Sequence, residues 1–76
     1  MSAKYSESYK RIGQVIREYR KEKGWTQEEL AEKTSISISY LTKIEAPNCD
    51  KAFSLEVLFD ISDALGINVC DLLKEL

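Results

Sequence analysis

Residues 25–45 constrain the fold more strongly than any other part of the sequence. Thr26 and Glu29 form a T-x-x-E capping box, in which each side chain accepts a hydrogen bond from the backbone N–H of the other residue. A box of this kind marks the start of a helix, and helix-forming residues follow it as far as Thr34. The sequence therefore predicts a short helix over residues 27–34.

A second short helix is predicted immediately afterwards, over residues 38–45. Ser37 is a favourable N-cap, because its hydroxyl oxygen can accept a hydrogen bond from the first turn of the helix. The helix is expected to end before Pro47, which disfavours a helical conformation at Ala46. Only a tight turn fits between this helix and the preceding one, so the two helices are held at a fixed angle.

Two helices that cross this closely need a small residue at their contact, and Ala31 is placed for that role. Apolar side chains from both helices and from the turn are spaced to form a small core around it. These residues are Leu30, Ile36, Leu41 and Ile44. Thr34 is expected to be partly buried, and the opposite side of the second helix faces outward.

Three further helices are predicted on either side of this pair. Over residues 8–23 the apolar residues recur at steps of three and four, which places them on one helical face, and Gly24 suits the end of that helix. A helix over residues 55–65 is stopped by Gly66, and another begins at residue 68 and reaches the C-terminus. No segment has the pattern of a strand. We therefore expect an all-α fold with five helices.

The length of 76 residues indicates one small domain, spanning residues 1–76. A chain of this size buries only about 60% of the surface that its unfolded form exposes, which leaves little room for a cavity that encloses a small-molecule substrate. Residues 1–7 are expected to form a flexible arm, and they lack the apolar core of a signal peptide. No apolar run approaches the roughly 20 residues needed to cross a bilayer. These observations predict a cytoplasmic protein that does not contact a membrane.

The sequence offers no set of metal ligands. Histidine is absent, and the two cysteines, Cys49 and Cys70, do not form a C-x-x-C pair. No other feature indicates a cofactor. A disulfide between the two cysteines is uncommon in a reducing compartment, but the sequence leaves it open.

Charge is distributed unevenly along the chain, although the net charge is only −2. Residues 1–23 contain seven Lys or Arg and three Glu, a net charge of +4. Residues 52–76 contain one Lys and five acidic residues, a net charge of −4. Small imbalances of this kind are common, but this one suits a domain that presents one face to an anion.

Several motifs follow one another at a regular spacing. They are I-R-x-x-R at residues 16–20, G-x-[ST]-Q-x-x-L-A at residues 24–31, S-x-x-Y-[IL]-[ST]-K-I-E at residues 37–45, and S-L-x-x-L-x-x-I-[AS]-x-A-L-G-[IV] at residues 54–67. In this order they resemble the Cro and phage-repressor family of bacterial helix-turn-helix regulators, over roughly residues 9–76. The resemblance implies a compact repressor-like domain that regulates transcription. It also implies that the helix over residues 38–45 lies in the major groove of double-stranded DNA.

The resemblance also implies a role for individual positions. Those implied to contact bases are Ile38, Ser39 and Lys43. Those implied to contact phosphate or sugar are Gln27, Ser37, Tyr40 and Thr42. Arg20 and Glu45 match a buried ion pair that links the first helix to the end of the helix over residues 38–45. For the polar positions among these, an ordinary solvated helix surface is the alternative interpretation.

Three features depart from the family pattern. Ser35 stands where the family usually has Gly, because the chain there visits positive φ, so backbone strain or a shifted turn is expected. The segment over residues 46–51 has one acid and one base instead of several cations. The helix over residues 27–34 carries three Glu and one Lys. Since fewer phosphate contacts weaken binding, we expect weak affinity from a single copy.

Dimerisation on an inverted-repeat operator would compensate for weak affinity. Two copies would present their groove-binding helices about 34 Å apart, one turn of the duplex. Four apolar residues near the C-terminus are expected either to form the homodimer interface or to close the monomer core. They are Phe59, Val69, Leu73 and Leu76.

A different class of function is left open by the sequence. The acidic C-terminal half and the lack of a basic loop also suit a protein-interaction module, such as an antitoxin-like partner that has kept the fold and binds DNA weakly or not at all. An enzyme is not expected, because the sequence contains no histidine, no glycine-rich phosphate loop and no G-x-S-x-G motif.

Overall fold

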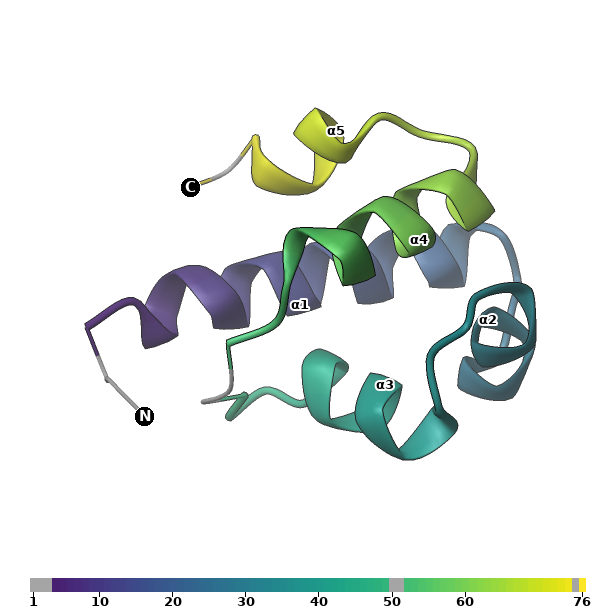
Figure 1. Ribbon diagram of the computed structural model, residues 1–76, viewed down its shortest axis with the longest axis horizontal. Helices are drawn as coiled ribbons and strands as arrows, with labels where there is room; N and C mark the ends of the chain where they lie inside the picture. Colours follow the sequence, from purple (N-terminus) through teal and green to yellow (C-terminus); the bar gives the residue numbers. More distant parts are fainter. Residues whose placement is uncertain (1–3, 50–51, 75) are drawn as a thin grey trace.

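The described part of the computed structural model, residues 4–49, 52–74 and 76, contains five helices and no strand (Figure 1). In chain order the helices are α1 (Ser6–Glu22), α2 (Gln27–Lys33), α3 (Ile38–Glu45), α4 (Leu55–Leu65) and α5 (Val69–Leu73). The predicted all-α fold with a two-helix unit at α2 and α3 is therefore confirmed. The longest helix, α1, runs the length of the molecule and contacts α3, α4 and α5.

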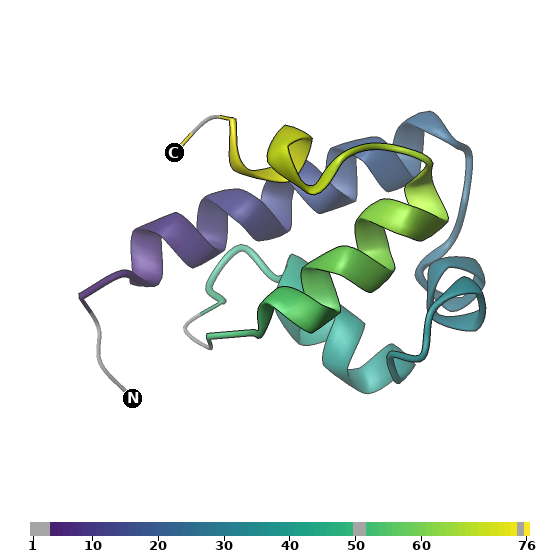
Figure 2. The same cartoon turned by 45° about the horizontal axis from the view of Figure 1, so that its top comes forward.

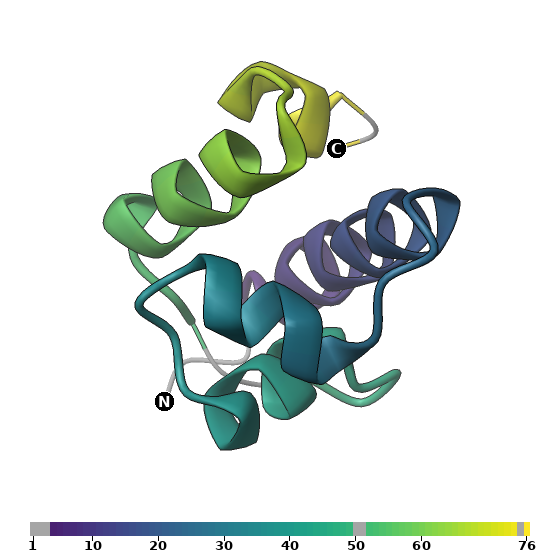
Figure 3. The ribbon, with the colours of Figure 1, turned by 90° about the vertical axis from the view of Figure 1, so that its right-hand side faces the viewer.

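The arrangement places α3 at one edge of the molecule and α5 at the opposite edge. Figure 3 shows α2 directly beside α3, with α4 and α1 above this pair. Figure 2 shows α5 lying along α1 and α4, on the side away from α3. The core between the helices consists of buried apolar residues: Ile12, Val15, Ile16, Leu30, Ile36, Leu41, Ile44, Cys49, Phe53, Leu58, Ile61, Leu65 and Leu72. All four residues predicted for the core of the α2–α3 unit are among them.

The start of α1 differs from the prediction. The helix begins at Ser6, so residues 6 and 7 are helical and are not part of a flexible arm. No side chain caps this end. Instead, the Tyr9 ring packs edge-on against the Phe53 ring, with 5.0 Å between the ring centroids. This contact with the segment before α4 stabilises a first turn that has no sequence signal of its own. Of the other residues of the predicted arm, 4 and 5 form a turn before the helix, and residues 1–3 lie outside the described part.

The other helix boundaries follow the capping residues closely. Helices α3 and α4 have the predicted bounds, with Ser37 and Ser54 accepting hydrogen bonds from the first turn of each. Helix α2 ends at Lys33, one residue early, because Thr34 is extended. Helix α5 starts at Val69, one residue later than predicted, and ends at Leu73, well before the C-terminus.

The expectation of strain at Ser35 is wrong. Within the described residues, only Gly24 and Gly66 have positive φ. The chain crosses the turn between α2 and α3 in an extended conformation at Thr34 and at Ser37, so no left-handed residue is required. The Ser35 hydroxyl donates a hydrogen bond of 3.0 Å to Asp60 Oδ2 on α4. This bond fixes the turn against α4.

A close approach of α1 and α3 depends on Gly13, which is buried in the middle of α1. A Cβ atom added there would overlap with the backbone carbonyl oxygen of Ile44. Glycine in the middle of a helix is unfavourable by roughly 0.5–1 kcal/mol relative to alanine. Here it allows the two helices to contact each other backbone to backbone, which fixes the position of α3.

Two further features bear on function. Cys49 is buried, Cys70 is exposed, and no disulfide joins the two cysteines. In the described residues, no helix is long and apolar enough to cross a membrane, and no group of three potential metal ligands occurs.

Candidate nucleic-acid interface

The outer surface of α3 is exposed to solvent. Ser37, Ser39, Thr42 and Lys43 are all exposed, and the Ile38 side chain is 44% exposed despite being apolar. Tyr40 is half-buried and packs against the core. The structure therefore brings six of the seven residues implied to contact DNA onto one helix and its N-cap, and five of them are exposed.

The inner surface of the same helix is fixed in the core. Leu41 and Ile44 are completely buried, with exposed fractions of 0% and 1%. Ala31 of α2 is half-buried against this core, as expected for the small residue at the contact between α2 and α3. A helix held in this way presents its outer side chains in a constant orientation, which recognition of base edges requires.

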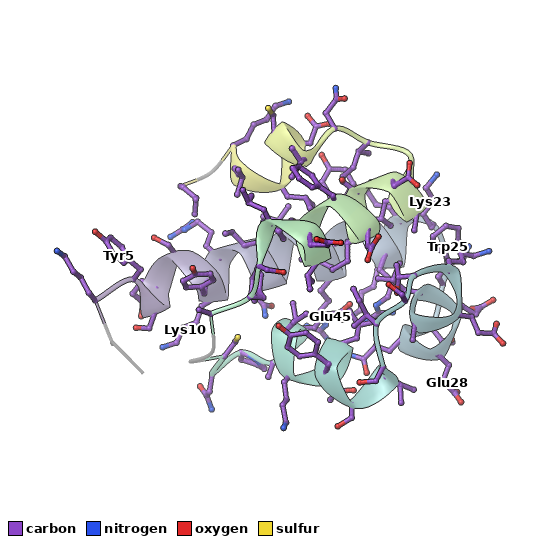
Figure 4. The ribbon with its side chains drawn as sticks, viewed as in Figure 1. Tyr5, Lys10, Lys23, Trp25, Glu28 and Glu45 are labelled. Atoms are coloured by element: carbon purple, nitrogen blue, oxygen red, sulfur yellow. The ribbon has the colours of Figure 1, made fainter. Side chains whose placement is uncertain are left out.

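The C-terminal end of α3 is surrounded by a polar cluster that we call the Glu45 cluster: Gln14, Arg20, Gln27 and Glu45. Arg20 Nε lies 2.9 Å from Glu45 Oε2, and Arg20 Nη2 lies 2.9 Å from Glu45 Oε1. This ion pair is buried, with side-chain exposures of 9% and 1%. It links α1 to α3 at the two residues that the family resemblance implies. Figure 4 shows Glu45 in the interior, between α1, α2 and α3.

Two amides complete the cluster. Gln14 Nε2 of α1 donates a hydrogen bond of 2.9 Å to the backbone oxygen of Glu45. Gln27 Nε2, at the start of α2, donates a bond of 3.1 Å to Glu45 Oε1. A third arginine hydrogen bond, from Nη1, reaches the backbone oxygen of Trp25 at 2.6 Å. In the described residues, no buried side-chain nitrogen or oxygen is left without a partner.

Gln27 thus has a structural role that the sequence did not indicate. Its Nε2 bonds Glu45, and its Oε1 lies 3.1 Å from the Thr42 hydroxyl. An amide nitrogen has two hydrogens, so one of them remains to donate to a phosphate. The Thr42 hydroxyl also lies 2.8 Å from the Ile38 carbonyl oxygen, within its own helix. Gln27 and Thr42 are therefore oriented by each other at the surface between α2 and α3.

Acidic residues lie beside this surface. Glu28, Glu29 and Glu32 of α2 are exposed and line a shallow hollow that also includes Ile38. Glu29 belongs to the capping box, in which Thr26 N–H donates to its carboxylate at 2.8 Å. Figure 4 shows Glu28 pointing away from the body of the molecule. A phosphate backbone passing this part of α2 would meet negative charge.

The cations near α2 are held by an aromatic ring. The ammonium groups of Lys33 and Lys23 lie 4.7 Å and 5.7 Å from the centre of the Trp25 ring. Trp25 is half-buried and packs against the core. The tryptophan therefore packs against the core while these two lysines lie over its ring.

Two residues of the site that the sequence did not predict are Gly13 and Gln14 of α1. Both contact the end of α3 through its backbone. An isolated glycine inside an amphipathic helix is a signal of close packing, so the packing role of Gly13 could have been predicted from the sequence. Gln14 carries no comparable signal, because its partner is a main-chain oxygen 31 residues away.

Known proteins share both the sequence and the fold. The family model described as helix-turn-helix matches residues 16–72. The transcriptional regulator SinR of Bacillus licheniformis is 45% identical over 64 residues, which is 84% of this chain and 57% of SinR, so the chain spans little more than half of that relative. Two solved structures are similar throughout this domain. The clp gene regulator ClgR from C. glutamicum has a TM-score of 0.78, with 37% identity over 88% of this chain and 84% of that chain.

The second structure is that of SinR, described as the master regulator for biofilm formation, in complex with DNA. It has a TM-score of 0.75 and 45% identity, over 82% of this chain and 97% of that chain. The family match covers the two-helix unit, the Glu45 cluster apart from Gln14, the last part of α1, α4 and most of α5. The chain therefore belongs to the Cro and phage-repressor type of the helix-turn-helix family.

Proposed function

We propose that this chain is a DNA-binding transcriptional regulator that inserts α3 into the major groove of an inverted-repeat operator. The main support is the contrast between the two sides of α3. Leu41 and Ile44 fix its inner side, while Ser39 and Lys43 on the outer side are exposed and make no side-chain hydrogen bond or ion pair within the described residues. SinR, which shares this fold and 45% of its residues in the matched segment, forms a complex with DNA.

The residues of the surface divide into two groups. We assign the base contacts to Ile38, Ser39 and Lys43: the exposed Ile38 side chain can contact a thymine methyl group, and the Lys43 ammonium can donate to guanine O6 and N7. The phosphate contacts are assigned to Gln27, Ser37, Tyr40 and Thr42. The Ser37 hydroxyl oxygen accepts from Tyr40 N–H at 3.1 Å, which leaves its own hydrogen for a phosphate.

The assignment of Lys43 is tested by Lys43→Ala. If Lys43 contacts guanine, this change weakens binding to a duplex selected from a random pool by about 1–3 kcal/mol. Lys74→Ala is the matched control, because it removes the same charge from the C-terminal end of α5. Fluorescence anisotropy with labelled duplex measures both affinities. Equal affinity of Lys43→Ala and the unmodified protein would remove Lys43 from the base-contacting group.

A homodimer is part of the proposal, since it would place two α3 helices about one helical turn apart. Phe59 and Leu76 are 52% and 60% exposed, so these two of the four C-terminal apolar residues are open to a second copy. Val69 and Leu73 are half-buried against the core and mainly close the monomer. Sedimentation at several concentrations tests this: Phe59→Glu should shift a dimer towards monomer, and a protein that is monomeric throughout the range would contradict it.

A protein-interaction module is the second candidate function, and one observation favours it. The exposed surface of α2 carries Glu28, Glu29 and Glu32, which would repel a phosphate backbone. Titration with mixed-sequence duplex at low salt decides between the two. Binding that weakens as salt rises supports the DNA-binding regulator. A flat anisotropy signal would instead favour a protein partner.

A further inference from the structure

Four polar residues of α1 lie on one face of the helix, and we call them the α1 stripe: Lys10, Gln14, Arg17 and Lys21. They are spaced by four, three and four residues, which aligns them along the helix axis. Three of the four are cations. Arg17 and Lys21 are exposed, and Lys10 and Gln14 are half-exposed.

The stripe is adjacent to the end of α3. Gln14, within the stripe, donates its hydrogen bond of 2.9 Å to the backbone oxygen of Glu45. Lys10 and Gln14 also line a shallow hollow together with Pro47, which follows α3 directly. Figure 4 shows Lys10 near the N-terminal end of α1, towards the segment that follows α3. The stripe is thus continuous with the surface proposed to contact DNA.

Gln27 connects the stripe to a proposed phosphate position. Gln14 and Gln27 approach Glu45 from different helices, at 2.9 Å from its backbone oxygen and 3.1 Å from Oε1. A DNA strand whose phosphate reaches Gln27 therefore passes close to α1. Arg17 is one helical turn beyond Gln14 and projects from the same face.

The cations of the α1 stripe make no strong ion pair with other side chains in the described residues. Among residues 4–49, 52–74 and 76, Arg17 and Lys21 make no ion pair or side-chain hydrogen bond with another residue. Lys10 pairs with Glu7 at 3.3 Å, but the Glu7 side chain is 87% exposed. A pair this exposed is weak, so a phosphate can replace the carboxylate. Glu18 lines the same hollow and is the one acid there besides Glu7.

The other places from which a domain of this shape could contact the backbone are poor in positive charge. Helix α2 presents three glutamates, and its Lys33 lies over the Trp25 ring. Residues 46–49, after α3, contain no charged residue. Positive charge is instead concentrated in residues 1–23. Among residues 4–49, 52–74 and 76, a duplex seated on α3 would find cations on α1 in addition to Lys43.

We propose that the α1 stripe is a second phosphate-binding surface, with Lys10 and Arg17 contacting the backbone that flanks the groove occupied by α3. The inference rests on the proposed function, because it requires DNA on α3. It extends that function beyond the family match, which begins at residue 16 and excludes Lys10 and Gln14. The contacts would be independent of sequence, since they involve phosphates alone.

The experiment compares the unmodified protein with Lys10→Gln, Arg17→Gln and the double variant, using a labelled mixed-sequence duplex at several salt concentrations. Each lost phosphate contact should make the negative slope of log K against log salt shallower by about 0.9, and the double variant should make it shallower by about 1.8. Lys74→Gln is the matched control, because it removes one cation from the opposite side of the molecule and should leave the slope unchanged. Thermal melts that match the unmodified protein show that each variant is folded.

The remaining outcomes separate the two proposals. If the unmodified protein binds but the double variant has the same slope, the α1 stripe is overturned and the role of α3 stands. If Lys74→Gln makes the slope shallower by as much as Arg17→Gln does, the effect follows net charge, and the proposal for the α1 stripe is again overturned. If the unmodified protein binds no duplex even at low salt, the proposed function fails and the stripe fails with it.

Discussion

The Glu45 cluster and helix α5 each contain an ion pair, but their surroundings differ. Arg20 and Glu45 have side-chain exposures of 9% and 1%, whereas Lys74 and Asp71 have exposures of 70% and 23%. The buried carboxylate accepts hydrogen bonds from Arg20 and from Gln27. The exposed one accepts from Lys74 and from the backbone N–H of Asn68.

The difference shows where this small domain depends on polar contacts. At the Glu45 cluster, water has been excluded from a full charge, so every partner of that charge is needed to offset the cost of desolvation. At the Lys74–Asp71 pair of α5, water can replace any partner that is lost. The first region holds α3 in position for its proposed function, and the second adjusts the stability of a terminal helix.

The largest expected effect is that of Glu45→Gln. This change leaves the Arg20 guanidinium buried without a counter-charge, and breaking a buried pair from one side costs about 3–5 kcal/mol. Urea titration of the unfolding transition measures the loss. Glu32→Gln is the matched control, because Glu32 is exposed on α2, and its replacement should change stability by less than about 0.5 kcal/mol. Similar small losses in both variants would show that the buried pair is not a main source of stability.

A smaller effect is expected from Gly13→Ala, which tests the backbone contact beside the same cluster. Alanine is normally favoured over glycine in a helix by roughly 1 kcal/mol. Here the added methyl group meets the carbonyl oxygen of Ile44, so α1 and α3 must move apart, and a net loss of about 1–3 kcal/mol is expected. Since the shift also moves α3, the affinity for DNA should fall with stability.

The control for this change is Glu18→Ala, which places alanine at an exposed position of the same helix. It should keep or slightly raise the melting temperature, because alanine has the higher helix propensity. An increase in stability for Gly13→Ala, similar to that of the control, would mean that α1 and α3 have room for a side chain at their contact.

Helix boundaries and long-range contacts differ in how far the sequence determines them. Helices α3 and α4 were predicted with their observed bounds because local residues determine both ends: Ser37 and Ser54 cap the starts, and Pro47 and Gly66 follow the ends. The capping box of α2 has the same local origin. A short-range signal of this kind is contained in a few neighbouring residues, so one sequence is enough to find it.

Contacts between distant residues were predictable only in part. The link between Arg20 and Glu45 came from the family resemblance, since no periodicity pairs two residues 25 positions apart. The early start of α1 was missed because it depends on the contact of Tyr9 with Phe53 and not on a cap. The conformation of the turn was missed because Ser35 was compared with a family glycine, although the extended backbone at Thr34 needs none.

The smallest expected effect concerns the Lys74–Asp71 pair of α5. The hydrogen bond from Lys74, followed by the backbone N–H of Asn68, lowers the pKa of Asp71 from its ordinary value of 3.8. A carboxyl group whose pKa is lower in the folded state contributes stability above its unfolded value, and this contribution is lost as the pH falls through the folded value. Asp71→Asn should therefore remove a small part of the stability at neutral pH and make no difference in strong acid. Melting temperatures of the two proteins should converge as the pH falls below 3.8, and parallel curves across that range would show that the pair contributes nothing to the folded state.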